Sequence, residues 1–127
     1  MQTEVKITLP THSFSGKTKH YLNLNQYRNW HYGVSNNLKR NYKKTISQYL
    51  DFKFDGEISI HYDYYAPDKR VRDLMNVVSV VDKFFQDTLV DKGCILADDT
   101  SIVKTISVEY KGVDKGNSRI EATIKSV

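Results

Sequence analysis

The feature that most constrains the fold is an alternation of side-chain types that runs from Phe52 to Tyr64. Apolar and aromatic side chains share one parity of this segment, and polar or charged side chains occupy the other. Successive side chains of a β-strand point to opposite faces, so the pattern predicts a half-buried strand, bent at Gly56 and ending near Ala66-Pro67. His61 falls in the polar set, and we interpret it as a surface or edge histidine rather than a metal ligand.

Shorter alternating segments predict three further strands. One covers residues 5–9 and ends at Pro10. Another follows residues 98–100 and carries apolar side chains at 106, 108 and 110. The last covers residues 118–125. The glycine-containing turn 112–117 between these two predicts that they pair as a hairpin.

Helical spacing of apolar residues occurs twice. Ser35 can cap a first helix, and a second should run from about Asp73 to Val90. The apolar face of the first helix would consist of Leu38, Tyr42, Ile46 and Tyr49, and the solvent side of the second would consist of Met75, Ser79, Asp82 and Gln86. The segment from Thr11 to Gly33 shows no clear period, which is typical of a functional loop. Residues 1–127 therefore predict one α+β domain, a two-layer fold with a four-stranded mixed sheet packed with two helices.

Positive charge is concentrated in the first part of the chain. The net charge is +4, yet no Asp or Glu occurs between Val5 and Leu50. That segment holds eight basic side chains, together with Trp30 and several tyrosines. A basic, aromatic surface suits a nucleic acid, whose phosphates give affinity and salt dependence without sequence specificity. A solvated basic face around ordinary core aromatics is the structural alternative.

Composition also limits the compartment. No segment approaches the ~20 apolar residues that cross a bilayer, and the N-terminus lacks the pattern of a signal peptide. Cys94 is the only cysteine, which excludes an internal disulfide and a cysteine-rich zinc site. We therefore expect a protein of a reducing interior, without membrane contact, in which Cys94 is a small core residue.

Carboxylates at the ends of two predicted elements indicate a chemistry. Arg70-Val71-Arg72-Asp73-Leu74-Met75-Asn76 lies where a strand should give way to a helix, and Asp98-Asp99 precedes a later strand. Magnesium prefers oxygen ligands and keeps several waters, so two or three such acids can suffice to hold it against a phosphodiester. Each acid also has a structural interpretation, as a helix N-cap for Asp73 and as a turn for Asp98-Asp99.

The segment Pro67–Asn76, followed by a helix and by Asp98-Asp99, resembles the RusA family of Holliday-junction resolvases from phages and prophages. The stretch Asn23-Leu24-Asn25-Gln26-Tyr27-Arg28 is similar to the N-terminal loop of that family. The resemblance covers essentially the whole chain in element order and length. It implies a RusA-like fold and a homodimeric, Mg²⁺-dependent endonuclease, with Mn²⁺ accepted, that resolves four-way DNA junctions by paired nicks. It also implies a role in phage recombination or repair in the cytoplasm of a bacterial host, without a small-molecule cofactor.

The resemblance also implies site residues. Asp73, Asp98 and Asp99 would bind the metal ion, and Asp73, Asp99 and Asn76 would be catalytic. A family lysine matches Lys83 or Ser79, depending on the direction of counting, and Lys83 is the candidate that we keep. The DNA-binding candidates are Lys17, Lys19, Arg28, Trp30, Lys39, Arg40, Lys43, Lys69, Arg70 and Arg72.

One departure from the family pattern leaves alternatives open. The family's second aspartate falls at Met75, which cannot bind a hard cation. The chain could therefore be a non-cleaving protein that binds branched DNA. A basic module for single-stranded DNA or RNA, without a metal, is a third hypothesis.

Overall fold

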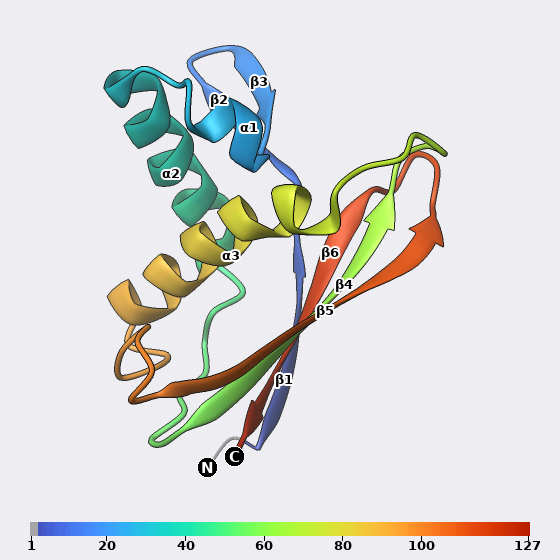
Figure 1. The fold of residues 1–127 in the computed structure, drawn as a ribbon. Helices are drawn as coiled ribbons and strands as arrows, with labels where there is room; N and C mark the ends of the chain where they lie inside the picture. The colour runs from blue at the N-terminus through green and yellow to red at the C-terminus, as the bar shows by residue number, and fades with distance from the viewer. Residues whose placement is uncertain (1–2) are drawn as a thin grey trace.

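A computed structural model describes residues 3–127 and has the α+β architecture that the sequence predicts (Figure 1). Four strands form a mixed sheet in the order β1-β6-β4-β5. Their bounds are β1 Glu4–Leu9, β4 Ile58–Ala66, β5 Val103–Val113 and β6 Arg119–Ser126. β4 and β5 run parallel, whereas β6 runs antiparallel to β1 and β4. Helices cover one face of the sheet, which confirms the two-layer fold class.

The predicted hairpin between the last two strands is wrong. β6 pairs with β1 on one side and with β4 on the other, so β4 separates it from β5. Ile120, Ala122 and Ile124 are fully buried, as their alternation predicts. Alternation reports which face of a strand is buried, but it does not identify the neighbouring strand. As a result, β5 lies at an edge of the sheet.

The strand predicted from Phe52 begins later, at Ile58, and from there its alternate residues are buried without exception. Phe54 is also buried, but its backbone N–H donates to the carbonyl of Cys94 at 2.8 Å. Phe52 and Phe54 therefore pack as a core-filling segment beside the chain that follows the second long helix. The predicted burial is confirmed at Phe54, whereas the prediction that these residues belong to a strand is wrong.

The first long helix, α2, spans Tyr32–Ser47 and begins three residues before the predicted cap at Ser35. His31 caps it instead, because its Nδ1 accepts a hydrogen bond from the N–H of Gly33 at 3.2 Å. The predicted apolar face is buried at Leu38, Tyr42 and Ile46. Tyr49 lies beyond the end of the helix and is exposed.

The second long helix, α3, spans Leu74–Asp91, and Asp73 is its N-cap, close to the predicted start. The prediction that Asp82 and Gln86 face solvent is wrong. Asp82 accepts hydrogen bonds from the hydroxyl of buried Tyr62 on β4 and from the Gln86 amide. α3 lies between the sheet and the N-terminal elements, so it is covered on two sides. A pattern with one apolar and one polar helix face therefore underestimates how many of its side chains are buried. Within residues 3–127, no helix is long and apolar enough to cross a bilayer.

The segment predicted as a loop from Thr11 to Gly33 is mostly ordered. It forms a two-stranded hairpin, β2 His12–Ser15 and β3 Thr18–Tyr21, followed by the short helix α1 Leu24–Tyr27. Gly16 adopts φ 60° in the two-residue turn, a conformation that glycine tolerates. Polar contacts dock this hairpin on α2: buried Ser13 donates to the carbonyl of Leu38 at 2.8 Å, and Asn41 donates to that of Phe14 at 2.7 Å. Because polar contacts rather than apolar side chains hold the hairpin on α2, the sequence of this segment shows no apolar periodicity.

Candidate functional site

A cleft of about 720 Å³ brings together residues 23–26 and residues 67–76, which lie far apart in the sequence. One wall is the end of β3 and the start of α1, with Tyr21, Asn23 and Gln26. The other wall is the β4–α3 loop and the first turn of α3. The complete lining is Thr11, Tyr21, Leu22, Asn23, Asn25, Gln26, Tyr64, Pro67, Asp68, Arg70, Val71, Arg72, Asp73, Asn76, Val77 and Ser118.

Asp68 organises the β4–α3 loop. Its Oδ1 accepts a hydrogen bond from the N–H of Arg70 at 2.9 Å and an ion-paired hydrogen bond from Arg72 at 2.8 Å. The backbone hydrogen bond from Arg70 and then the Arg72 guanidinium hold the pKa of the Asp68 carboxyl below its usual value. Arg72 thus makes its hydrogen bonds within the loop, whereas Arg70 is exposed and is one of the residues that line the cleft.

Asp73 stands at the start of α3 as the sequence predicts. One carboxylate oxygen accepts from the N–H of Met75 at 3.0 Å, so Asp73 makes the contact of a helix N-cap. Asn76, one turn along, also lines the cleft. Met75 lies between them in sequence but is not part of the lining, and its side chain is 51% exposed.

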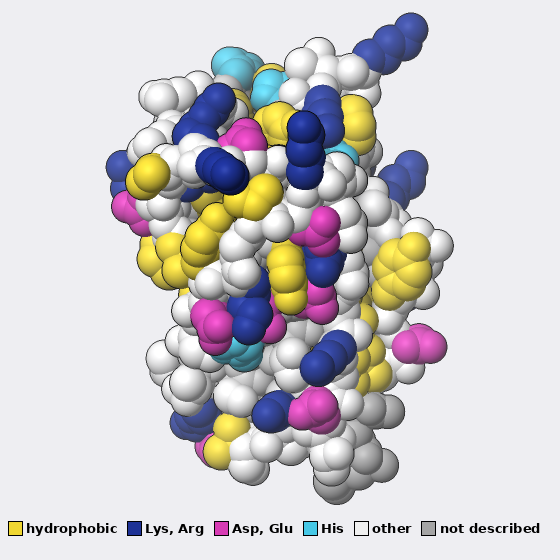
Figure 2. All heavy atoms as spheres, turned by 90° about the vertical axis from the view of Figure 1, so that its right-hand side faces the viewer, with side chains coloured by type: hydrophobic (Ala, Val, Ile, Leu, Met, Phe, Trp, Pro, Cys, Tyr) yellow, Lys and Arg dark blue, Asp and Glu magenta, His cyan; other side chains and the backbone are white. Residues whose placement is uncertain are grey.

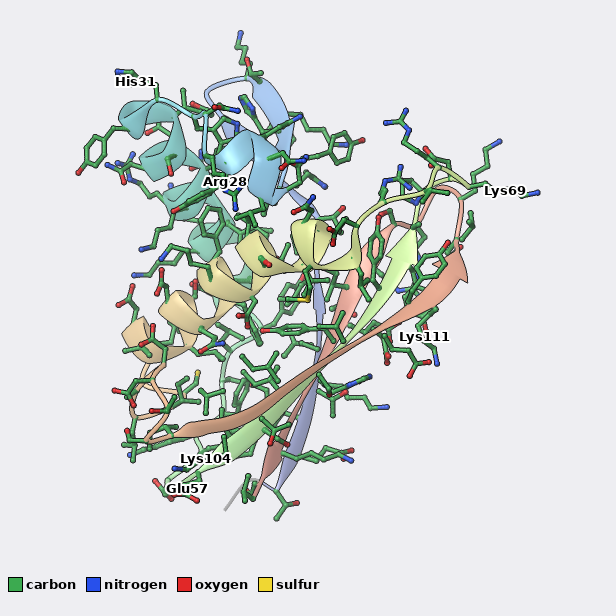
Figure 3. All side chains as sticks on the ribbon, in the orientation of Figure 1. Arg28, His31, Glu57, Lys69, Lys104 and Lys111 are labelled. Carbon is green, nitrogen blue, oxygen red and sulfur yellow. The ribbon has the colours of Figure 1, made fainter. Side chains whose placement is uncertain are left out.

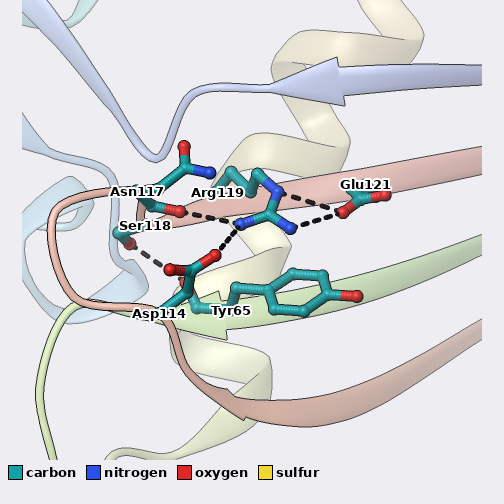
Figure 4. Close-up of polar contacts among 6 residues, drawn as sticks. All are labelled: Tyr65, Asp114, Asn117, Ser118, Arg119 and Glu121. Carbon is teal, nitrogen blue, oxygen red and sulfur yellow. Dashed lines mark hydrogen bonds and ion pairs between the residues drawn. The ribbon is translucent and has the colours of Figure 1, made fainter.

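Arg119 at the start of β6 is the centre of a cluster of polar contacts beside Ser118, which lines the cleft (Figure 4). Its guanidinium lies 3.9 Å from the centre of the Tyr65 ring and pairs with Asp114 at 2.7 Å and Glu121 at 2.9 Å. The neighbouring Ser118, which lines the cleft, donates to the carbonyl of Tyr65 at 3.1 Å. These contacts tie the turn before β6 to the end of β4.

Asp98 and Asp99 lie at the other end of the molecule, which contradicts the expectation that one chain brings them to Asp73. They follow α3, whose 18 residues span about 27 Å, and they precede β5. Asp99 accepts from the N–H of Ser101 at 2.9 Å, and its hydrogen bonds from Ser101 lower its carboxyl pKa. Figure 3 labels Lys104, five residues after Asp99, near the start of β4. Lys69, on the β4–α3 loop that leads to Asp73, lies at the opposite end of the sheet.

Within residues 3–127, the side chains that could hold a metal ion together also lie away from Asp73, Asp98 and Asp99. The one group of three such side chains within reach of a single ion is His61, Asp63 and Glu109, on the sheet face that carries no helix. His61 is already paired there, with Asp63 at 2.8 Å and with Ser107 at 2.6 Å. A magnesium site built from Asp73, Asp98 and Asp99 does not fit within one chain.

Comparisons with known proteins do not assign a family. No protein-family model matches this chain, and no curated protein matches its sequence. The RusA resemblance therefore stays a prediction, and the site is argued from its own geometry.

The predicted DNA-binding cations divide into paired and unpaired side chains. Lys39 and Lys43 on α2 form ion pairs with Asp87 and Asp91 of α3, at 2.8 and 2.6 Å. The hydrogen bond to Asp87 raises the pKa of Lys39, so that lysine serves the helix contact. Figure 2, which views the side of the β4–α3 loop, shows basic and acidic side chains intermingled.

The remaining candidates lie on the hairpin, on α1, on α2 and on the loop. Lys17, Lys19, Arg28, Lys69 and Arg70 are exposed, and Arg40 bonds to Asn37 at 3.2 Å. Trp30 packs edge-on against His20 and Tyr27, so it anchors the N-terminal elements and has a structural role. Lys83 is exposed on α3 but does not line the cleft.

Sequence reasoning missed the cleft's aromatic and amide groups. Tyr21 is 54% exposed, lines the cleft and lies under the Lys19 ammonium, 5.0 Å from its ring centre. Asn23, Asn25 and Gln26 add amide donors. The one signal for these groups in the sequence is the resemblance of residues 23–28 to a family loop. It indicates the segment but does not specify its contacts.

Replacement of an unpaired cation should weaken DNA binding, whereas replacement of a paired one should not. Arg70→Ala removes an exposed guanidinium and is expected to lower the affinity for a four-way junction about tenfold, the scale of one charge-assisted hydrogen bond. The salt dependence of binding should also fall by about one phosphate contact. Lys43→Ala is the matched control, because Lys43 is neutralised by Asp91. Titration at several salt concentrations measures both quantities, and equal losses in the two variants would contradict the assignment.

Proposed function

We propose that this protein is a Mg²⁺-dependent endonuclease that resolves four-way DNA junctions by paired symmetric nicks, as a homodimer in the cytoplasm of a bacterial host. The observation that carries the proposal is the convergence of residues 23–26 and 67–76 on one cleft. These segments are far apart in sequence, and the sequence alone indicates each of them as part of a functional site. Their meeting supports a shared role on one ligand.

The cleft has the groups that a phosphodiester requires. Arg70 supplies an exposed guanidinium, which matches the geometry of a phosphate. Tyr21 supplies a flat surface on which an unpaired base can stack. Asn76 presents an amide that can orient a water molecule next to Asp73.

The metal ion requires acids from two subunits. A single chain offers Asp73 at the cleft and holds Asp98 and Asp99 beyond the far end of α3. In a two-fold dimer the start of α3 in one subunit can face the start of β5 in the other, and symmetry makes two such sites. When bound, Mg²⁺ would polarise the scissile phosphate and lower the pKa of its bound water. Two equal sites suit a junction in which two opposed strands are cut.

Cleavage of a synthetic four-way junction tests the proposal. The protein is expected to nick two opposed strands with Mg²⁺ or Mn²⁺, and Asp73→Asn should reduce the rate by about 100-fold or more, the scale of losing one group that stabilises transition-state charge. Asparagine retains an oxygen for the N–H of Met75, so the variant should keep the fold. Labelled strands on a denaturing gel show the cuts.

Two other results would replace the proposal. Junction binding without cutting in either ion would identify a non-cleaving protein for branched DNA. The separation of the acids within one chain and the methionine at position 75 favour this second candidate. Tighter binding to single strands than to a junction would instead indicate a single-strand module.

A further inference from the structure

The face of the sheet that carries no helix brings a histidine and two carboxylates together. His61 and Asp63 lie on β4, and Glu109 lies on β5, directly opposite Asp63. The neighbouring β4 side chains Ile60 and Tyr62 are buried under the helices, so these three side chains point to the open face. The ligand atoms of the three all lie within 4.8 Å of one another. None of the three residues lines the cleft of the proposed function.

We infer that His61, Asp63 and Glu109 bind a transition-metal dication such as Zn²⁺ on the open face of the sheet. The inference goes beyond the proposed function and does not depend on it. An imidazole nitrogen with two carboxylates suits Zn²⁺, whereas Mg²⁺ prefers oxygen ligands. Three protein ligands leave a position for water, which fits a partly exposed site. The sequence alone favours a surface role for His61, because it does not show which side chains of β5 lie beside that residue.

The contacts of His61 orient its ring for such an ion. Its Nδ1 lies 2.6 Å from the hydroxyl oxygen of Ser107, and its Nε2 lies 2.8 Å from Oδ1 of Asp63. A histidine that binds a metal through one ring nitrogen usually donates the other N–H to a nearby oxygen, which fixes the ring. Ser107 can accept that hydrogen bond, and Nε2 then directs its lone pair at Asp63. A lone pair and a carboxylate oxygen repel each other at this distance unless a proton or a metal ion lies between them, so the dication would take the place of one proton.

The charges around Asp63 also favour a dication. Asp63 lies opposite Glu109 of β5 on one side and opposite Glu121 of β6 on the other, so three carboxylates form a row across the sheet. Like charges directly opposite each other destabilise strand pairing. Of the outer two acids, Glu109 pairs with Lys111 at 3.0 Å, and the acid of β6 pairs with Arg119 at 2.9 Å. The central Asp63 pairs with an imidazole, which is charged only when it is protonated. An ion held by Asp63 and Glu109 would supply a permanent positive charge at the centre of the row.

Lys111 is the group that competes with the ion for Glu109. Its side chain is 37% exposed, so its ammonium can turn into solvent when the ion binds. Lys111→Ala removes this competitor and is expected to tighten Zn²⁺ binding about threefold, the scale of one exposed ion pair. Lys104→Ala is the matched control, because Lys104 pairs with Glu57 at 3.4 Å toward the other end of the sheet (Figure 3). An equal gain in both variants would indicate attraction by net charge and would contradict a defined site.

Calorimetric titration of the full, chelator-treated chain with Zn²⁺, without DNA, tests the site. Wild-type protein is expected to bind one ion per chain with a dissociation constant on the order of micromolar, and excess Mg²⁺ should not displace that ion. Glu109→Gln and His61→Gln each remove a ligand and should weaken binding about 100-fold, and Ser107→Ala, which removes only the partner of the His61 ring, about tenfold. Glu57→Gln is the matched control and should bind as the wild type does, because Glu57 is also an exposed acid paired with a lysine.

Binding should also stabilise the sheet, because the ion would connect β4 to the edge strand β5. At a free Zn²⁺ concentration about 100 times the dissociation constant, the midpoint of thermal unfolding is expected to rise by about 10 °C. Glu109→Gln should lose this rise, and Glu57→Gln should keep it. Thermal unfolding with and without Zn²⁺ measures the difference.

The outcomes separate this inference from the proposed function. Absence of Zn²⁺ binding, binding in the millimolar range only, or equal losses in Glu109→Gln and Glu57→Gln would overturn the site. If Glu109→Gln fails to fold, His61→Gln and Ser107→Ala decide. Junction cleavage by a protein that does not bind Zn²⁺ would leave the function standing and remove the site, and Zn²⁺ binding without any cleavage would do the reverse.

Discussion

A mixture of two inactive variants, Asp73→Asn and Asp99→Asn, is expected to regain junction-nicking activity. Each variant alone should lose about 100-fold or more, because both sites of its dimer lack one acid. In a mixed dimer one site lacks both acids, and the other combines the intact Asp73 of one subunit with the intact Asp99 of its partner. Co-expression or co-refolding followed by a gel assay measures the recovery. A dimer with one working site should nick one strand and leave the junction unresolved.

The matched control mixes Asp73→Asn with Asn76→Ala. Residues 73 and 76 line the same cleft, so every site of the mixed dimer carries one defect and no activity should return. Asparagine at 73 or 99 keeps an oxygen for the local contacts with Met75 and Ser101, which limits effects on folding. Absence of recovery in both mixtures would show that the acids do not share an ion between subunits.

Most of the fold could be predicted from the sequence because alternation and helical spacing report burial directly. The buried parity of β4 and β6 and the apolar face of α2 agree with prediction at every residue that the structure assigns to those elements. Strand neighbours could not be predicted in this way. β6 inserts between β1 and β4 rather than pairing with β5, and both arrangements bury the same alternate side chains.

The candidate site could be predicted in its parts but not in its assembly. Position at the start of an element put Asp73 correctly at the N-cap of α3, and it put Asp99 correctly in the turn before β5. Closeness in space depends on the direction of α3, which carries the chain from one end of β4 to the other. The local sequence around each acid does not specify the distance between Asp73 and Asp99, because that distance depends on how α3 packs.

Charge patterning had a similar limit. The basic first part of the chain holds Lys39 and Lys43, whose partners Asp87 and Asp91 lie far along the sequence on α3. An absence of nearby acids therefore did not mean absence of ion pairs. A DNA-binding role for the exposed cations of the hairpin and of the β4–α3 loop stays a prediction, whereas Lys39 and Lys43 account for part of the excess positive charge through ion pairs between helices.

Replacement of Met75 by aspartate is expected to increase metal-dependent cleavage, by about tenfold at limiting Mg²⁺ if the added carboxylate contributes ~1.4 kcal/mol to binding the ion. Met75 is half exposed, so its loss removes little buried apolar area. It lies in the first turn of α3, where a negative charge interacts favourably with the helix dipole. The variant should therefore be at least as stable as the wild type. Cleavage rates across a Mg²⁺ titration, with thermal unfolding of both proteins, measure the two effects.

Met75→Asn is the control for this gain, because asparagine matches aspartate in size and lacks its charge. A rate that rises with Asp alone indicates that the start of α3 faces the ion and that the wild-type protein works with a reduced set of acids. Equal rates for both variants would place the ion away from this turn of the helix. A wild type that binds but never cuts, together with a Met75→Asp variant that cuts, would identify the natural protein as the non-cleaving form, because one lost ligand would then separate binding from hydrolysis.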